Sequence, residues 1–185
     1  MINDILNEAD GKMDKSVETT REEFAAIRAG RANPAMLSKI MVDYYGTPTP
    51  LQSLASFTAQ DARVILVSPY DMGALGNIER AIRDSDLGAN PANDGVVIRV
   101  VLPILTEERR RDYVRLARTK GEDAKVSVRS VRRRAKEELD RLVKDKEIGE
   151  DEGARAEKEL EVLTKKHVDG IDVLLKAKEA ELLEV

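Results

Sequence analysis

The strongest chemical signal in the sequence is a run of cations between residues 107 and 136. This segment carries 12 basic and 5 acidic side chains, in a 185-residue chain whose net charge is −4. On a helix, where side chains advance by about 100° per residue, eight of these cations share an arc of roughly 100°. The eight are Arg111, Arg115, Arg118, Lys125, Arg129, Arg132, Arg133 and Lys136. Because most of them are arginines, whose planar fork suits phosphate, this face is suited to grip a nucleic-acid backbone.

A solvated helix surface is the alternative interpretation of the same run. Several of the cations are like-charged pairs four residues apart, such as Arg111 with Arg115 and Lys125 with Arg129. Each such pair is unfavourable by roughly 0.2–0.5 kcal/mol, and a surface selected for solubility would interleave acids. We therefore favour phosphate binding. Only 3% of the residues are aromatic, which favours recognition of phosphates and shape over stacking on bases.

Other residue types offer little catalytic chemistry. The chain has no cysteine and one histidine, His167, which excludes thiol nucleophiles and cysteine-ligated metals and leaves little room for a Ser-His-Asp triad. His167 lies on an apolar helix stripe, and we interpret it as a core or boundary residue. The acidic residues show no metal-ligand spacing, and Gly73 and Gly76 form no phosphate-binding loop pattern. We expect a protein that is not an enzyme and has no metal and no cofactor.

Two further features are weaker. The Tyr44-Tyr45-Gly46 turn is either a partner contact or a hairpin corner, and the sequence leaves both open. The chain opens with an acidic, polar stretch unlike a signal peptide. Since no apolar run approaches the roughly 18 residues of a membrane span, we expect a cytoplasmic protein with no membrane partner.

Three long amphipathic helices must position the cationic face. Apolar residues at three- and four-residue steps predict a first helix over residues 2–30. A second helix begins after the N-cap Thr106 and runs to about Ile148, where Gly149 ends it, and a third begins at about Glu150. Three such helices with no strand among them indicate a three-helix bundle.

A small mixed domain interrupts the bundle between residues 31 and 105. The β-branched runs Val64–Val67 and Val96–Leu102 predict strands. The segment between them, roughly Met72–Arg83, has helical spacing. The Gly, Pro and Asn content of Asp86–Gly95 predicts a turn. The expected fold class is therefore α+β, an elongated bundle with an inserted small β/α/β domain.

The expected domains are residues 1–30 with 106–185, and residues 31–105. The chain then crosses between them twice, near 30–34 and near 103–106, and a joint made of two crossings bends rather than swivels freely. The expected hinge residues are Gly30, Ala32, Asn33, Pro34, Pro103, Leu105 and Thr106.

Ordered motifs along the whole chain resemble those of the bacterial ribosome recycling factor family. They are IRAGRANP (Ile27–Pro34), YYGTPTPL (Tyr44–Leu51), LAS (Leu54–Ser56), SDLGANP (Ser85–Pro91), Ile98–Arg110 with its terminal LTEERR, AKVSVRSVRR (Ala124–Arg133) and the final KEAELLEV. The chain length also suits the family. The resemblance implies an L-shaped arrangement of a three-helix bundle and a β/α/β domain, joined by a two-stranded hinge.

The resemblance also implies partners and site residues. The partners are the 70S post-termination ribosome, its large-subunit ribosomal RNA, and elongation factor G with GTP, whose GTP hydrolysis drives the subunits apart. Arg129 and Arg132 match family positions that contact ribosomal RNA. Auxiliary contacts near the bend are expected at Arg28, Arg31, Arg110 and Arg133. The cationic face adds Arg118 and Lys125, and we expect a monomer.

Two other binding functions remain as alternatives. One is a ribosome-associated storage or stalling factor that binds without splitting the subunits. The other is a helical adaptor that binds protein through its apolar and charged faces. Salt dependence separates the adaptor from RNA binding, because about five phosphate contacts predict a log–log slope near −4, whereas an adaptor predicts a flat response.

Overall fold

The structure, a computed structural model, describes residues 1–184. These residues gather into two compact units, one formed by residues 1–24 and 115–179 and the other by residues 25–114 and 180–184. The domain boundaries expected from the sequence follow the ends of the predicted helices instead, and they remain a prediction.

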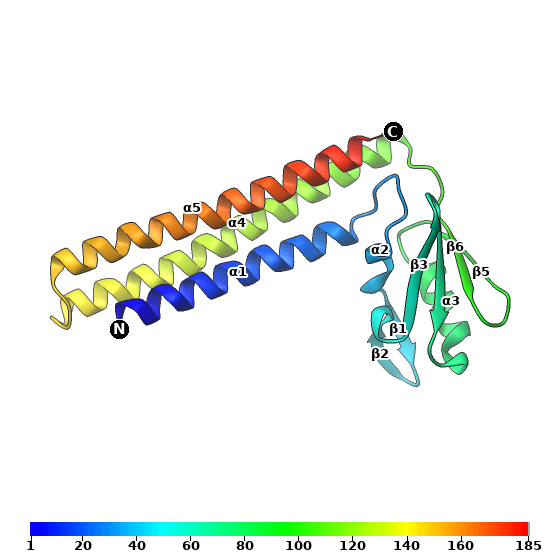
Figure 1. Cartoon of the computed structure of the whole chain (residues 1–185), viewed down its shortest axis with the longest axis horizontal. Helices are drawn as coiled ribbons and strands as arrows, with labels where there is room; N and C mark the ends of the chain where they lie inside the picture. Colours follow the sequence, from blue (N-terminus) through cyan, green and yellow to red (C-terminus); the bar gives the residue numbers. More distant parts are fainter. Residues whose placement is uncertain (185) are drawn as a thin grey trace. The chain divides into compact units, whose positions relative to one another are not determined.

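Three long helices run side by side, as the sequence predicts (Figure 1). They are α1 (Ile2–Ala26), α4 (Glu107–Lys144) and α5 (Glu150–Leu183). Their shared core contains one apolar face from each helix, with Leu6, Ala9, Met13, Val128, Ala135, Leu139, Ala156, Leu160 and Ile171 all buried. Burial of these stripes at helical spacing is what holds the helices together, since a lone amphipathic helix is marginal in water. Among residues 1–184, no helix has the length and apolar character that crossing a bilayer demands.

The end of α4 differs from the prediction. The helix stops at Lys144 rather than near Ile148, because Lys146 adopts a left-handed conformation with φ of 59°. The Glu147 amide donates to the Leu142 carbonyl oxygen at 2.9 Å and the Lys146 amide donates to the Val143 carbonyl oxygen at 3.0 Å. This pair of bonds is a Schellman closure. Lys146 occupies the left-handed position that glycine usually fills after a helix. The prediction, which took Gly149 as the residue that ends the helix, was therefore wrong.

The first helix also ends early, at Ala26 instead of residue 30. The chain that follows leaves the helical path, and the Ala32 amide donates to the Ala62 carbonyl oxygen at 2.7 Å. Residues 27–29 are buried although they lie outside any helix.

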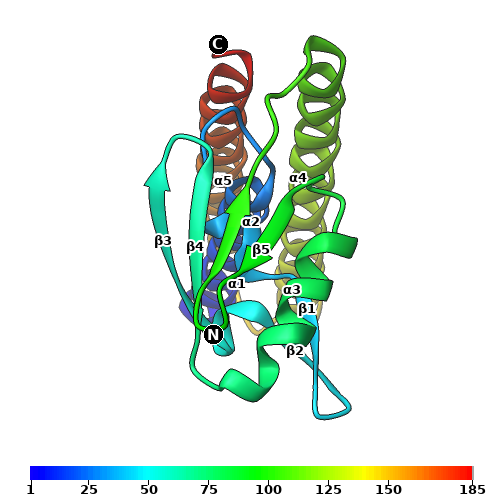
Figure 2. The same ribbon diagram turned by 90° about the vertical axis from the view of Figure 1, so that its right-hand side faces the viewer.

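The second unit contains six short strands and the helix α3 (Leu75–Asp84). Strands β3 (Ala55–Asp61), β4 (Val64–Pro69), β6 (Ile98–Val101) and β5 (Asn90–Asn93) form an antiparallel sheet in that order (Figure 2). The remaining elements are β1 (Met41–Tyr44), paired antiparallel with β2 (Thr47–Pro50), the one-turn helix α2 (Ala35–Ser38), and 3-10 turns at Leu51–Ser53 and Met72–Ala74. The α+β fold class is confirmed.

Two strands of this sheet escape the sequence patterns. Asn90–Asn93 lies inside the segment predicted as a turn, yet it forms β5 at the sheet edge, where a proline is tolerated because one side needs no ladder bonds. Strand β3 forms the other edge and is mostly exposed, so it lacks an alternating apolar signal. In the centre, β4 and β6 bury Ile65, Val67 and Ile98, as their β-branched runs predict.

Candidate nucleic-acid interface

The cationic face lies on α4, and the structure divides it into two parts. The part beside α5 forms an antiparallel ladder of ion pairs with carboxylates of α5. We call the four cations Arg118, Lys125, Arg132 and Lys136 the paired ladder. Their α5 partners are Glu179 at 2.7 Å, Asp172 at 2.5 Å, Glu161 at 2.6 Å and Glu157 at 3.8 Å, in that order.

The ladder weakens the argument that repulsion between like charges on α4 favours phosphate binding. The acids absent from the α4 sequence are supplied by α5, so the ladder cations are interleaved with carboxylates after all. Hydrogen bonding to Asp172 raises the pKa of Lys125 above its usual value. Lys136 is held by Asp140 on its own helix at 2.9 Å, and this hydrogen bond likewise raises its pKa. These side chains are partly neutralised before any ligand arrives.

The other part of the face carries less compensation. We call Arg111, Arg115, Arg129 and Arg133 the open ridge, because all four are exposed and lie at two neighbouring angular positions on α4. Arg111 pairs with Glu107 on the same helix at 2.5 Å. Within residues 1–184, the side chains of Arg129 and Arg133 make no ion pair and no hydrogen bond. These two guanidinium groups therefore keep all their donors for a ligand.

Of the four contacts predicted near the bend, Arg133 belongs to the open ridge, and the other three lie in different environments. Arg31 is exposed. Arg110 donates to the Glu184 carbonyl oxygen at 2.5 Å. Arg28 is buried, with 5% of its surface exposed, and donates to the Leu87 carbonyl oxygen at 3.4 Å. Burial lowers the pKa of Arg28, and its Nε has no hydrogen-bond partner among the described residues.

Residues in or directly next to the two predicted crossings are bonded to the turn between β3 and β4, and all of them lie within the second unit. The Ala32 amide donates to the Ala62 carbonyl oxygen at 2.7 Å, and the Leu102 amide donates to the Arg63 carbonyl oxygen at 2.8 Å. Arg63 returns a bond from its Nε to the Leu102 carbonyl oxygen at 3.2 Å. Ala32, in the first predicted crossing, and Leu102, which directly precedes the second, are thus bonded to one two-residue turn.

The other expected hinge residues fix the ends of helices or cover apolar surface. The Asn33 side chain accepts from the Ala35 amide at 3.0 Å, next to Pro34 at the start of α2. The Thr106 hydroxyl oxygen accepts from the Arg109 amide at 3.2 Å and caps α4. Gly30 and Pro103 are exposed, whereas Leu105 is buried.

The Tyr44-Tyr45-Gly46 segment is the corner of the β1–β2 hairpin. Tyr45 and Gly46 have φ of 50° and 85°, which are the left-handed values that a tight hairpin turn requires. Both tyrosine hydroxyls donate to Asp71 Oδ2, at 3.0 and 3.1 Å. These bonds raise the pKa of each tyrosine, and hydrogen bonds from Gly73 and the tyrosines lower the pKa of Asp71. A partner contact at the exposed Tyr45 remains a second possibility.

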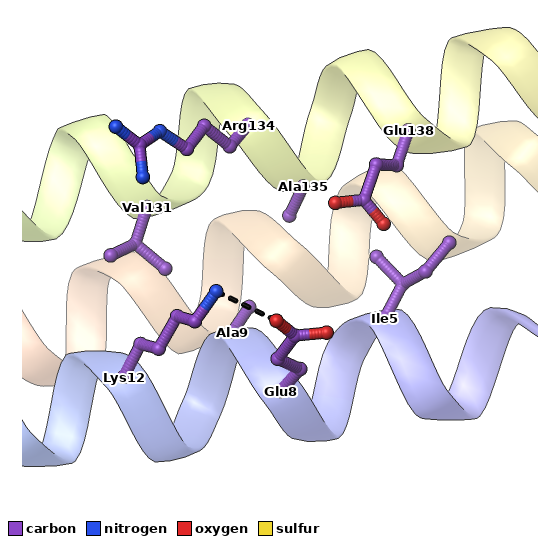
Figure 3. A pocket seen from close by; sticks show the side chains of 8 residues that line it. All are labelled: Ile5, Glu8, Ala9, Lys12, Val131, Arg134, Ala135 and Glu138. Atoms are coloured by element: carbon purple, nitrogen blue, oxygen red, sulfur yellow. Dashed lines mark ion pairs between the residues drawn. The ribbon is translucent and has the colours of Figure 1, made fainter.

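A hollow lined by apolar and charged side chains lies between α1 and α4 (Figure 3). Ala9 and Ala135 are its most buried residues, and Lys12 Nζ lies 2.7 Å from Glu8 Oε1 beside them. The eight residues that line it include no hydroxyl, thiol or imidazole. The hydrogen bond from Lys12 lowers the pKa of Glu8.

His167 is buried in the bundle, as its place on an apolar stripe indicates, with 3% of its surface exposed. Its surroundings are nevertheless polar, because Asp10 and Asp14 on α1 lie against its ring. One nitrogen or oxygen atom from each of the three side chains could bind a metal ion, and these atoms all lie within 4.8 Å of one another. No local sequence pattern predicts this cluster, because 153 positions separate Asp14 from His167.

Comparisons with known proteins agree on one family. The family model described as ribosome recycling factor matches residues 20–183. The ribosome-recycling factor of a Nocardioides species is 69% identical over 185 residues, which is the whole of both chains, and that of Beutenbergia cavernae is 68% identical over the same span.

Two solved structures are similar over their full length. A solution structure of a ribosome recycling factor has a TM-score of 0.75 and 43% identity, covering 100% of this chain and 98% of the other. The second structure describes the T. thermophilus ribosome recycling factor and E. coli elongation factor G bound to the E. coli post-termination complex. It has a TM-score of 0.69 and 42% identity, with both chains covered completely.

Proposed function

Because the chain belongs to the ribosome recycling factor family, we propose that it recycles post-termination ribosomes. It binds the large subunit and, with elongation factor G and GTP, separates the two subunits. The T. thermophilus relative, described with elongation factor G on a post-termination complex, supports both partners. The open ridge is the structural feature that supports the proposal. On a protein of net charge −4, Arg129 and Arg133 present guanidinium groups that no carboxylate neutralises among the described residues.

Arg129 and Arg133 are the principal contacts in this proposal. Each can donate two parallel hydrogen bonds to a phosphate, which is the strong form of arginine recognition. Arg132 differs, because its Nε already donates to Glu161 at 2.6 Å and its side chain is 32% exposed. It binds RNA only by sharing its donors with Glu161 or by releasing that carboxylate. The same holds for Lys125, which is paired with Asp172, and for Arg118, which is paired with Glu179.

The chain supplies binding and mechanical coupling rather than catalysis. In this proposal GTP hydrolysis belongs to elongation factor G, and the chain itself hydrolyses nothing. It acts as a monomer in the cytoplasm, where post-termination ribosomes occur.

The two crossings form the hinge of the proposed mechanism. Ala32 in the first crossing and Leu102 directly before the second are bonded to the β3–β4 turn through Ala62 and Arg63, and we infer that a rotation of the small domain changes the backbone angles of both crossings together. Such a hinge restricts the motion to bending. A push on the small domain then reaches the bundle as a directed displacement.

Light scattering from post-termination ribosomes tests the function directly. Ribosomes mixed with the chain, elongation factor G and GTP should lose scattering as the subunits separate, and omission of any one of the three should prevent the loss. If the chain sediments with ribosomes but scattering stays constant, the molecule is a storage or stalling factor and the recycling proposal is wrong.

A further inference from the structure

His167 occupies an unusual position for the only imidazole of a chain. It lies on α5, buried, and its Nε2 is 2.7 Å from Asp14 Oδ1 and 3.3 Å from Asp10 Oδ1. Asp10 and Asp14 stand one turn apart on α1, which runs beside α5 (Figure 1). Two carboxylates and one imidazole nitrogen therefore converge on a single point between two helices.

The other ring nitrogen fixes the form of the imidazole. His167 Nδ1 lies 2.7 Å from the Leu163 carbonyl oxygen. A carbonyl oxygen only accepts, so Nδ1 carries a hydrogen and donates it. A neutral ring would then direct its Nε2 lone pair at two anionic oxygens, which is repulsive. A cation must therefore lie between Nε2 and the carboxylates, and it is either a proton or a metal ion.

A buried oxygen atom distinguishes the two cations. Asp10 Oδ1 is buried and has no hydrogen-bond partner among the described residues. A proton on Nε2 points along one line, and at 2.7 Å that line goes to Asp14. It leaves Asp10 Oδ1, which lies 3.3 Å from Nε2, outside that hydrogen bond. A metal ion at the convergence point contacts all three atoms at once.

We propose that Asp10, Asp14 and His167 form a binding site for a divalent first-row transition metal, with Zn²⁺ as the best fit. Tetrahedral Zn²⁺ with bonds of about 2.0–2.1 Å separates its ligand atoms by about 3.3 Å. The distance from Asp10 Oδ1 to His167 Nε2 already has this value. The distance from Asp14 Oδ1 to Nε2 is 2.7 Å and would have to widen by about 0.6 Å when the ion binds. The Leu163 carbonyl supplies the outer-shell bond that metal-bound histidines usually make.

The exposure of the carboxylates leaves a coordination position open to water. The side chains of Asp10 and Asp14 are 39% and 66% exposed, and Asp10 also lines a groove between α1 and α5 together with Asn7 and Leu163. Imidazole favours Zn²⁺, Ni²⁺ or Cu²⁺ over Mg²⁺ and Ca²⁺, which prefer oxygen ligands. A bound ion would join the first helix of the bundle to the last.

The test uses the untagged full chain, freed of metal with a chelator and titrated with Zn²⁺ in a calorimeter. Because the chain has one histidine and no cysteine, every imidazole nitrogen signal in a ¹⁵N spectrum belongs to His167. We expect one equivalent of Zn²⁺ to bind and to move the Nε2 signal, and an equal concentration of Mg²⁺ to leave it unchanged.

Matched variants locate the ion. Asp14→Asn and Asp10→Asn should each weaken binding at least about tenfold, since even outer-shell changes reach 10–100-fold. Asp4→Asn removes a carboxylate from the same helix, with a side chain 92% exposed, and should bind like wild type. Asp14 is exposed enough that its variant should fold, which circular dichroism checks.

Two results overturn the proposal. If Nε2 keeps its proton at saturating Zn²⁺ and its signal stays in place, the cation in the site is a proton. If all three variants bind Zn²⁺ as wild type does, the ion lies elsewhere on the chain.

Discussion

At the scale of single residues, the arginines of this chain fall into three environments. Arg129 and Arg133 are exposed without a partner among the described residues, Arg132 is paired with a carboxylate, and Arg28 is buried. All of them are simply cations in the sequence. Their availability to a phosphate differs because it depends on what the fold brings beside each one.

Arg28 serves packing in this account, and its substitution should show that. Arg28→Met keeps a long apolar stem and removes a buried charge that has no carboxylate partner among the described residues. The free energy of unfolding in urea should change by less than about 1 kcal/mol, because apolar replacements of buried charges are often neutral. Arg28→Ala should cost about 2–3 kcal/mol, since it also removes the packed stem. Equal losses in both variants would instead show that the guanidinium itself is required.

Lys125 gives the paired ladder a signature at high pH. Its pKa is raised in the folded state by the hydrogen bond to Asp172, so folding favours the protonated form. The stabilisation is fully present below the usual lysine pKa of about 10.4 and is lost as pH rises through the higher folded value. Lys125→Gln should lower the free energy of unfolding by up to about 1 kcal/mol at pH 8. The difference from wild type should shrink above pH 11, and a difference that stays constant there would contradict the pairing.

At the scale of elements, periodicity predicts what faces the core and little else. The apolar stripes located three helices correctly, because burial of a stripe determines which residues form it. The end of α4 could not be predicted, since Lys146 takes the left-handed position that glycine usually fills. Strands β3 and β5 were not predicted, because edge strands need neither a buried apolar face nor hydrogen bonds on both sides.

The candidate site was half predictable for a related reason. The angular position of each cation on α4 follows from its own sequence. The pairing with Glu161, Asp172 and Glu179 depends on the register between α4 and α5, and no local pattern contains that register. The contact of His167 with Asp14 is equally non-local.

Two glycines of the bundle should respond in opposite directions to alanine. A Cβ on Gly11 meets nothing within 4 Å, so Gly11→Ala should raise the free energy of unfolding by about 1 kcal/mol through helix propensity. A Cβ on Gly153 would lie 2.6 Å from Val143 Cγ2. Val143 is β-branched and yields poorly, so Gly153→Ala should destabilise the chain. Thermal unfolding compares the two, and a stabilised Gly153→Ala would show that the turn between α4 and α5 can shift.

At the scale of the whole molecule, charge is segregated and then partly recombined. Residues 107–136 carry a net charge of +7 and residues 137–185 a net charge of −7. Antiparallel pairing of α4 with α5 neutralises one flank of the cationic face, and the open ridge is the part that we propose binds RNA. A protein of net charge −4 can therefore bind RNA through a narrow strip.

The hinge proposal predicts that binding and splitting can be separated. Gly30→Pro fixes one backbone angle in the first crossing and restricts Ala29 before it. Ribosome binding should stay within about twofold of wild type, because a backbone change at Gly30 removes no phosphate contact of the open ridge. Subunit splitting should be abolished, so light scattering should stay constant. Gly30→Ala is the control, since its Cβ would make only ordinary contacts of 3.7 Å or more. Normal splitting by the proline variant would show that this crossing need not bend.

We propose that the open ridge, rather than cationic charge in general, holds the RNA. The most direct measurement is the affinity of the chain for large ribosomal subunits over a range of salt concentrations. It compares Arg129→Glu/Arg133→Glu with Arg134→Glu/Arg141→Glu, which makes the same change in charge at exposed positions on another face of α4. We predict that the ridge variant binds at least tenfold more weakly and that its log–log salt slope falls by about 2, whereas the control matches wild type. Equal losses in the two variants would contradict the account.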